Sequence, residues 1–180
     1  MKRFLLALVL SSSLLPLASV AVAAESTTTV LKADIPSPRK ETTGKLGDAT
    51  ITVNYGSPSV KGRKVFGGLE PFGKVWRAGA NEATTFTTST DLKVAGESLP
   101  AGTYGFFIEP MAEGAWTVIF NAVAKQWGAY RYDASEDVLR VKVVPETAGS
   151  PSETLEYTIE NSALVMHWAD VKLVVPLAAK

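Results

Sequence analysis

The sequence predicts an all-β protein, a single antiparallel β-sandwich or open barrel of jelly-roll-like form. Three observations support this prediction. Apolar and polar residues alternate with a period of two along many short segments, which is the pattern of half-buried strands. Turn-forming residues separate these segments at intervals of roughly 8 to 12 residues, as in sandwiches and barrels. After residue 24, no window shows a convincing helical period.

The first candidate strand is "TITVNY", in which Ile51, Val53 and Tyr55 share one face. Similar segments follow up to the C-terminus: "TYGFFI" (103–108), "WTVIFN" (116–121), "VLRVKV" (138–143), "TLEYTIE" (154–160), "ALVMHWA" (163–169) and "VKLVV" (171–175). Short turns that contain glycine or proline lie between them, such as "LPAGTY" and "MAEGAW". Short connections of this kind favour antiparallel strands over a parallel sheet with helices.

Residues 1–24 have the features of a cleavable signal peptide. Lys2 and Arg3 precede an apolar stretch from Phe4 to Leu17, and the small residues of "AVAA" follow. The apolar stretch is shorter than the roughly 20 residues that a membrane-spanning helix needs. The chain has no cysteine, so a lipid anchor and disulfides are excluded. We expect an exported protein, periplasmic or secreted, without a transmembrane anchor.

The remaining chain divides by composition. Residues 25–45 are rich in threonine, proline and charge, so we expect an extended N-terminal arm, with the folded domain at 46–180. The chain has 18 basic and 18 acidic residues, and loss of Lys2 and Arg3 with the signal peptide would leave a slight acidic excess. This balance gives no indication of the basic surface by which proteins bind nucleic acids.

The segment "VWRAGANE" is expected to form a corner between two strands. Val75–Ala78 would end one strand and Ala83–Thr88 would begin the next, with Trp76 in the core. Gly79 can adopt the positive φ of a tight connection, and Asn81 tolerates such an angle.

This corner would bring Arg77 within reach of Glu82. One interpretation is an exposed ion pair, which contributes about 0 to 1 kcal/mol. The other is that both side chains converge with Asn81 at the rim of the sheet, as donors and acceptors for a polar ligand. Turn chemistry alone explains the glycine and the asparagine, so the pattern leaves both interpretations open.

Several segments together match a known family. They are "YGSPSVKGRKVFGGLEPFGKVWRAGANEATTF", "LPAGTYGFFIEP", "WTVIFN", "QWGAYRYD" and "DVLRVKV". From about Ile35 to the C-terminus the chain resembles the exported bacterial family catalogued as domain of unknown function 2911. The resemblance implies no activity, substrate or cofactor. The family usually has threonine where this chain has Ala78. The resemblance favours a binding role for polar loop residues among those that fit its pattern: Lys61, Gly62, Arg63, Trp76, Arg77, Gly79, Ala80, Asn81, Glu82 and Thr84.

Other sites are weakly indicated. A hydrolase triad would need His167, the only histidine, but it lies in a strand pattern and "GxSxG" is missing. With one histidine and no cysteine, the chain lacks the usual ligands of a zinc site. Asp133, Glu136 and Asp137 in "DASED" could hold calcium, but the alternating acids and central glycine of such a loop are missing, which favours a solvated turn. We expect neither a metal nor another cofactor.

Two further loops carry candidate ligand-binding residues. "KGRK" presents Lys61 and Arg63 beside a glycine and could bind a carboxylate or phosphate, although basic loop residues are usually just exposed. "QWGAYRY" could form an aromatic platform for a sugar ring with Trp127, Tyr130 and Tyr132. Aromatic residues near strands more often belong to the core.

Three hypotheses of different classes follow. The preferred one is an exported binding module for a small polar or carbohydrate-like ligand, with the ligand-binding residues Lys61, Arg63, Arg77, Asn81, Glu82 and Trp127. The second is a hydrolase-type enzyme in which Glu82 acts with Glu70 or Glu109, although no catalytic motif is present. The third is a structural or assembly partner in the cell envelope that uses a strand edge or an apolar patch.

Overall fold

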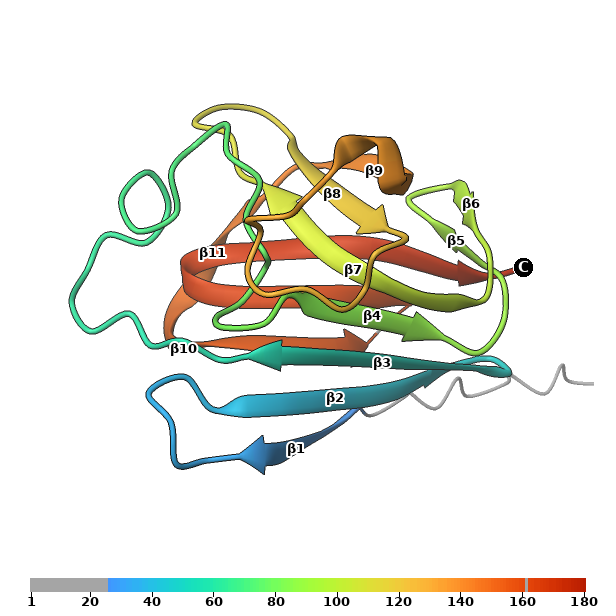
Figure 1. The fold of residues 1–180 in the computed structure, drawn as a ribbon, viewed down its shortest axis with the longest axis horizontal. Helices are drawn as coiled ribbons and strands as arrows, with labels where there is room; N and C mark the ends of the chain where they lie inside the picture. The colour runs from blue at the N-terminus through green and yellow to red at the C-terminus, as the bar shows by residue number, and fades with distance from the viewer. Residues whose placement is uncertain (1–25, 161) are drawn as a thin grey trace, which may run out of the picture.

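The computed structural model describes residues 26–160 and 162–180, which form two antiparallel sheets packed face to face (Figure 1). The larger sheet has the order β1 (Thr27–Lys32), β2 (Arg39–Leu46), β3 (Ala49–Gly56), β4 (Thr84–Thr88), β7 (Gly102–Glu109), β8 (Trp116–Asn121) and β9 (Asp137–Val143). The smaller has the order β10 (Glu146–Glu160), β11 (Ala163–Ala179), β5 (Leu92–Val94) and β6 (Glu97–Leu99). The predicted all-β sandwich is confirmed. The expected signal peptide lies outside the described residues.

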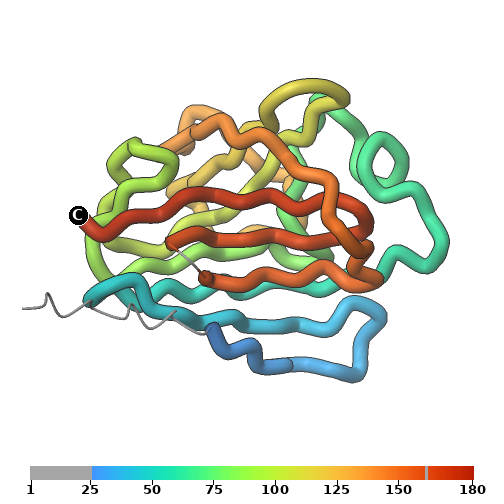
Figure 2. The backbone as a smooth tube through the Cα atoms, turned by 180° about the vertical axis from the view of Figure 1, so that it is seen from behind, coloured from blue at the N-terminus to red at the C-terminus, as the bar shows by residue number. Residues whose placement is uncertain are grey.

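Neighbours in the larger sheet follow chain order, except that the β5–β6 hairpin leaves it after β4. This hairpin joins the smaller sheet, where Val94 pairs with Leu177 near the end of β11. Seen from behind, β10 and β11 run side by side across the back of the sandwich (Figure 2). A single 3-10 turn, η1 (Ala134–Glu136), is the only helical segment in the part of the chain that the structure describes, and no helix there could cross a membrane.

The segment expected to be an N-terminal arm contributes two strands to the larger sheet. β2 pairs with β3 along its whole length, from Arg39↔Gly56 to Leu46↔Ala49. The buried positions of β2 are Thr42 and Gly44, which are polar or small. The Thr42 hydroxyl donates a hydrogen bond to the Tyr157 carbonyl at 3.1 Å. An apolar alternation is therefore absent from this strand, and sequence patterning missed it.

The main core lies between the two sheets. Ile51, Val53 and Tyr55 are fully buried, as their alternation predicts. At one end, Trp76 stacks on Trp168 with ring centroids 5.6 Å apart, and Phe66 meets both rings edge-on. This aromatic cluster is linked to the corner that follows Trp76, because Trp76 Nε1 donates a hydrogen bond to the Gly79 carbonyl at 3.1 Å.

A second, smaller cluster forms on the outer face of the larger sheet. Phe107 of β7 and Ile119 of β8 are buried there and pack against Ala129 and Tyr132 of the loop that joins β8 to η1. In Figure 1 this loop crosses in front of β7. Tyr132 is thus a packing residue rather than part of a platform, and the loop that carries Trp127 is held against the sheet.

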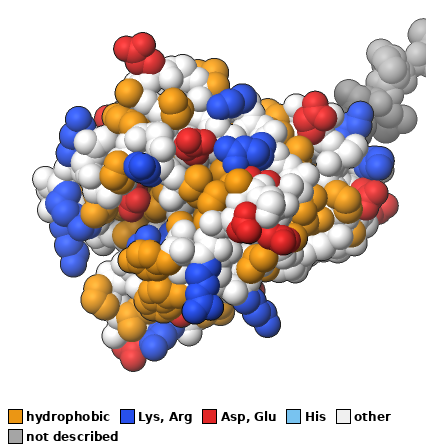
Figure 3. All heavy atoms as spheres, turned by 45° about the horizontal axis from the view of Figure 1, so that its top comes forward, with side chains coloured by type: hydrophobic (Ala, Val, Ile, Leu, Met, Phe, Trp, Pro, Cys, Tyr) orange, Lys and Arg blue, Asp and Glu red, His pale blue; other side chains and the backbone are white. Residues whose placement is uncertain are grey.

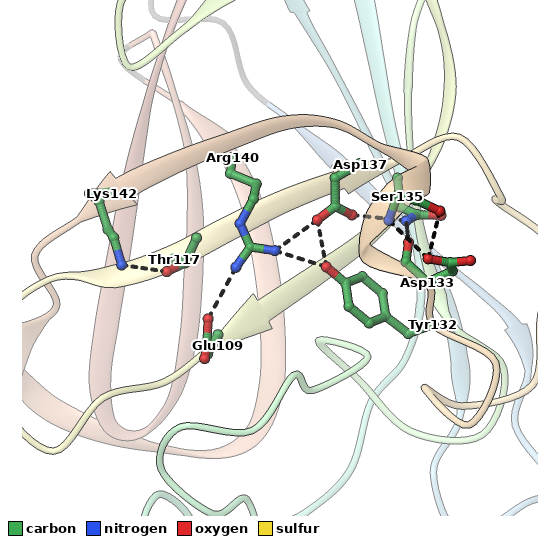
Figure 4. Close-up of polar contacts among 9 residues, drawn as sticks. Glu109, Thr117, Tyr132, Asp133, Ser135, Asp137, Arg140 and Lys142 are labelled. Atoms are coloured by element: carbon green, nitrogen blue, oxygen red, sulfur yellow. Dashed lines mark hydrogen bonds and ion pairs between the residues drawn. The ribbon is translucent and has the colours of Figure 1, made fainter.

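Polar contacts fix the end of the same loop (Figure 4). The Asp137 carboxylate accepts hydrogen bonds from Tyr132 Oη at 2.5 Å, Arg140 Nη1 at 2.7 Å and Asn121 Nδ2 at 2.9 Å. Burial and this carboxylate raise the pKa of Tyr132 to about 12, against the effect of Arg140. Arg140 also pairs with Glu109 at 3.2 Å.

Two acids of "DASED", Asp133 and Asp137, therefore have local structural roles. The Asp133 carboxylate accepts hydrogen bonds from the backbone N and Oγ of Ser135 at 2.9 and 2.7 Å and caps η1. These hydrogen bonds lower the pKa of the Asp133 carboxyl. Among residues 26–160 and 162–180, no three potential metal ligands gather at one place.

Candidate functional site

The corner after Trp76 differs in its backbone from the predicted one. Val75–Ala78 is not a strand, since Trp76 makes only a single bridge to Ile108, and β4 begins at Thr84. Positive φ angles occur at Ala78 (52°) and Asn81 (65°), so the prediction holds for the asparagine and is wrong for Gly79.

Gly79 is required for close packing instead. A Cβ atom there would lie 2.7 Å from Thr84 Oγ1 and 3.0 Å from the Gly56 carbonyl oxygen. The core also holds the preceding residue, because the Ala78 carbonyl accepts hydrogen bonds from Tyr157 Oη at 2.8 Å and from Thr84 Oγ1 at 2.9 Å. The corner is thus a fixed support for the residues that follow it.

The expected contact between Arg77 and Glu82 does not form. Glu82 Oε2 instead lies 3.8 Å from Nη1 of Arg39, at the start of β2. Arg77 Nε is buried without a hydrogen-bond partner among the described residues, and the Arg77 side chain lies close to Gly128. The positive charge beside Glu82 therefore comes from β2, a strand that the sequence pattern did not predict.

Asn81, Glu82 and Trp127 meet at one cleft of about 620 Å³, here called the Trp127 cleft; its other lining residues are Lys32, Ile35, Pro36 and Arg39. A short antiparallel ladder joins the corner to the loop that carries Trp127. In it, Ala83 N donates to the Gln126 carbonyl at 2.9 Å and Gly128 N donates to the Asn81 carbonyl at 3.1 Å. Three of the six predicted ligand-binding residues thus share one cavity.

Arg39 lines the Trp127 cleft and is held in place by hydrogen bonds. Its guanidinium donates hydrogen bonds to the Asn54 side chain, to the Asn54 carbonyl at 3.3 Å, and to the carbonyls of Glu82 at 3.3 Å and Ala83 at 3.4 Å. Burial lowers the pKa of Arg39, and the Glu82 carboxylate opposes this shift. The Arg39 side chain is 17% exposed and that of Glu82 56%, so the carboxylate keeps acceptor sites open toward the cleft.

The other predicted ligand-binding residues lie elsewhere. Arg63 donates to the carbonyls of Ser59 at 2.6 Å and Val60 at 2.9 Å and lines a separate cleft of about 580 Å³. Lys61 is exposed, and its backbone N donates to Glu153 at 2.9 Å. Neither residue lines the Trp127 cleft, and neither does Arg77.

The carboxylates considered for catalysis do not gather. Among the described lining residues of the Trp127 cleft, Glu82 is the only acid, and Glu109 pairs with Arg140. Glu70 does not line this cleft, and the charges that act on it are those of Arg77 and Arg63. His167 is half-buried on β11 and contacts the Ser150 carbonyl at 3.0 Å, as a plain strand residue would.

Glu70 makes stability depend on pH. Burial raises the pKa of its carboxyl from 4.5 to about 7, although the positive charges of Arg77 and Arg63 act the other way. The folded protein thus holds the proton more tightly than the unfolded chain does. The free energy of unfolding should therefore fall as the pH rises from 4.5 through about 7.

Urea denaturation at a series of pH values across this window tests the role of Glu70. Glu70→Gln cannot ionise and should lose this part of the pH dependence. The exposed Glu97 on β6 serves as the control, and Glu97→Gln should keep the wild-type slope. An unchanged slope in Glu70→Gln would show that another group is responsible.

The chain was compared with known protein families, curated proteins and solved structures. Residues 37–177 match the family described as "Protein of unknown function (DUF2911)". The chain belongs to this family. No curated protein and no solved structure matches it. The matched region of this DUF2911 chain includes Arg39, Asn81, Glu82 and Trp127, whereas the Lys32–Pro36 wall of the cleft precedes it.

Proposed function

We propose that this DUF2911 protein is an exported binding module that holds a small polar or carbohydrate-like ligand in the Trp127 cleft. One arrangement carries the proposal. The Trp127 side chain is exposed beside the Arg39–Glu82 pair and the Asn81 side chain. The features of a signal peptide in residues 1–24 support a role after export.

The lining residues match the chemistry of a sugar. A flat indole packs against the C–H face of a sugar ring, while its hydroxyl groups need donors and acceptors held in place. Glu82 supplies acceptors, Asn81 supplies both a donor and an acceptor, and the positive charge of Arg39 holds the Glu82 carboxylate in place. The volume of about 620 Å³ lies within the roughly 300 to 1,000 Å³ of small-molecule sites.

The two other hypotheses gain less support. Glycoside hydrolysis by an acid and a base needs two carboxyl groups about 5 to 10 Å apart, and Glu82 is the single acid among the described residues that line the cleft. On the face that Figure 3 shows, hydrophobic side chains are interspersed with lysine, arginine and acidic residues rather than joined in one apolar surface. This face is therefore not a large apolar patch of the kind that marks a stable assembly interface.

Ligand screening by thermal shift, followed by titration calorimetry, tests the binding function. We expect sugars or sugar acids to raise the melting temperature of the purified protein. Trp127→Ala should weaken the affinity for such a ligand by about tenfold or more, because a central tryptophan is a frequent hot spot.

Glu82→Gln should weaken the same ligand's binding, since glutamine loses the charge that pairs with Arg39. Its matched control is Glu97→Gln on β6, which is also exposed but lies outside the lining of the Trp127 cleft. The absence of any ligand, or equal affinity in wild type and Trp127→Ala, would refute this function.

A further inference from the structure

Trp127 also borders a second hollow. It has a volume of about 490 Å³ and is lined by Val123, Lys125, Gln126, Trp127, Tyr130 and Arg131. Trp127 is the one described residue that lines both this hollow and the Trp127 cleft. A ligand longer than one ring can therefore contact this side chain and still reach polar groups in both spaces.

The second hollow has its own aromatic surface. Tyr130 is 86% exposed, and its ring lies over Gly128, where an added Cβ would come within 3.0 Å of two ring atoms. The Gly128 φ of +65° also favours glycine. Tyr130 thus rests on the backbone while most of its ring stays open to solvent, as a sugar-stacking residue requires.

Basic residues outnumber acidic ones around the two hollows. Lys125 and Arg131 line the second hollow without an acid, and Lys32 and Arg39 face only Glu82 in the first. Within the described part of the chain, Lys32, Lys125 and Arg131 form no ion pair. The whole sequence has a formal net charge of +0, so this excess is a local property.

We infer that the ligand is an anionic oligosaccharide of at least two sugar residues that spans both hollows across Trp127. This inference rests on the proposed binding function and names its ligand class. Two aromatic faces would stack on successive rings, while Lys125 and Arg131 would bind the acidic groups. Carboxylate and sulfate groups share this chemistry. The Glu82 carboxylate would accept hydrogen bonds from the hydroxyl groups of the sugar in the first hollow, while the acidic groups would lie at Lys125 and Arg131 in the second.

Titration calorimetry with oligogalacturonates tests the inference. Affinity should increase by about tenfold or more from the monomer to the tetramer if both hollows are used. The fully methyl-esterified tetramer has the same length without charge and should bind much more weakly. Added salt should weaken binding of the acidic tetramer and leave the ester unaffected. A sulfated galactan oligosaccharide of equal length tells the two acidic groups apart, and binding of either supports the inference.

A double variant with Lys125→Gln and Arg131→Gln isolates the second hollow. Both side chains are exposed, so the melting temperature should not change. The variant should lose roughly tenfold or more in affinity for the acidic tetramer, and it should bind the uncharged, methyl-esterified tetramer as weakly as wild type does. The matched control, Lys93→Gln on the exposed side of β5, should bind like wild type.

The outcomes separate this inference from the proposed function. Neutral sugars that bind as tightly as acidic ones, and lose affinity in Trp127→Ala, would leave the binding function standing and overturn the anionic ligand. The same holds if the double variant binds the acidic tetramer like wild type. Tighter binding of single-stranded oligothymidylate than of any sugar would overturn both. Absence of binding to acidic sugars would overturn the inference, and absence of any small polar or carbohydrate-like ligand would overturn the proposed function as well.

Discussion

Replacement of Trp168 by alanine should lower the free energy of unfolding by about 3 to 5 kcal/mol, the usual cost of removing a large buried aromatic side chain. Trp168 on β11 is 0% exposed and lies 5.6 Å from Trp76 and 5.9 Å from Phe66 between ring centroids. Its Nε1 has no hydrogen-bond partner among the described residues, so the loss would be one of packing. The resulting cavity would lie beside Trp76, whose Nε1 donates a hydrogen bond to the Gly79 carbonyl in the corner that precedes Asn81 and Glu82.

Urea denaturation followed by far-UV circular dichroism measures this loss. Trp127→Ala is the matched control, because it removes the same side chain from a site that is 59% exposed. It should change the free energy of unfolding by less than about 1 kcal/mol. Equal losses in the two variants would contradict the position of Trp168 in the centre of the core.

Replacement of Gly56 by alanine should also disturb the corner that carries Asn81 and Glu82. A Cβ at Gly56, the last residue of β3, would lie 2.2 Å from the Ala80 carbonyl oxygen and 2.9 Å from its carbon. Backbone atoms must then move, and overpacking of this kind costs about 1 to 3 kcal/mol or more. Because Ala80 precedes Asn81, ligand affinity should fall together with stability.

The control for Gly56→Ala is Gly149→Ala on β10, where no atom lies within 4 Å of an added Cβ. Gly149→Ala should unfold at nearly the wild-type urea concentration. The same midpoint for both variants would show that the corner is not packed against the end of β3. A loss of stability with unchanged ligand affinity would show that the corner does not position the binding residues.

Alternating segments were predicted well wherever one face of a strand enters an apolar core. Ile51, Val53 and Tyr55 were expected to point inward and are fully buried. The prediction failed where the inward residue is not apolar. On β2, the Thr42 hydroxyl donates a hydrogen bond to the Tyr157 carbonyl, and Gly44 faces Ile159. The buried residues of this strand are therefore not apolar, and the sequence shows no hydrophobic alternation there.

The candidate site was only partly predictable. Loop chemistry pointed to Asn81, Glu82 and Trp127, which the structure brings to one cleft. Arg39 was missed, and Arg77 was wrongly expected to pair with Glu82. Arg39 reaches Glu82 through pairing of β2 with β3 and of β3 with β4, and no local sequence pattern reports such contacts.

The sequence by itself determined that the chain forms antiparallel strands, which faces of most strands are buried, and which loops carry polar and aromatic side chains. These features follow from alternation and turn chemistry, which act between near neighbours in the chain. Only the tertiary structure decided that Arg39, Glu82 and Trp127 face one cavity while Arg63 and Arg77 do not. The reason is that strand pairing and the ladder between 81–83 and 126–128 join distant segments, and their register depends on the packing of the whole sandwich.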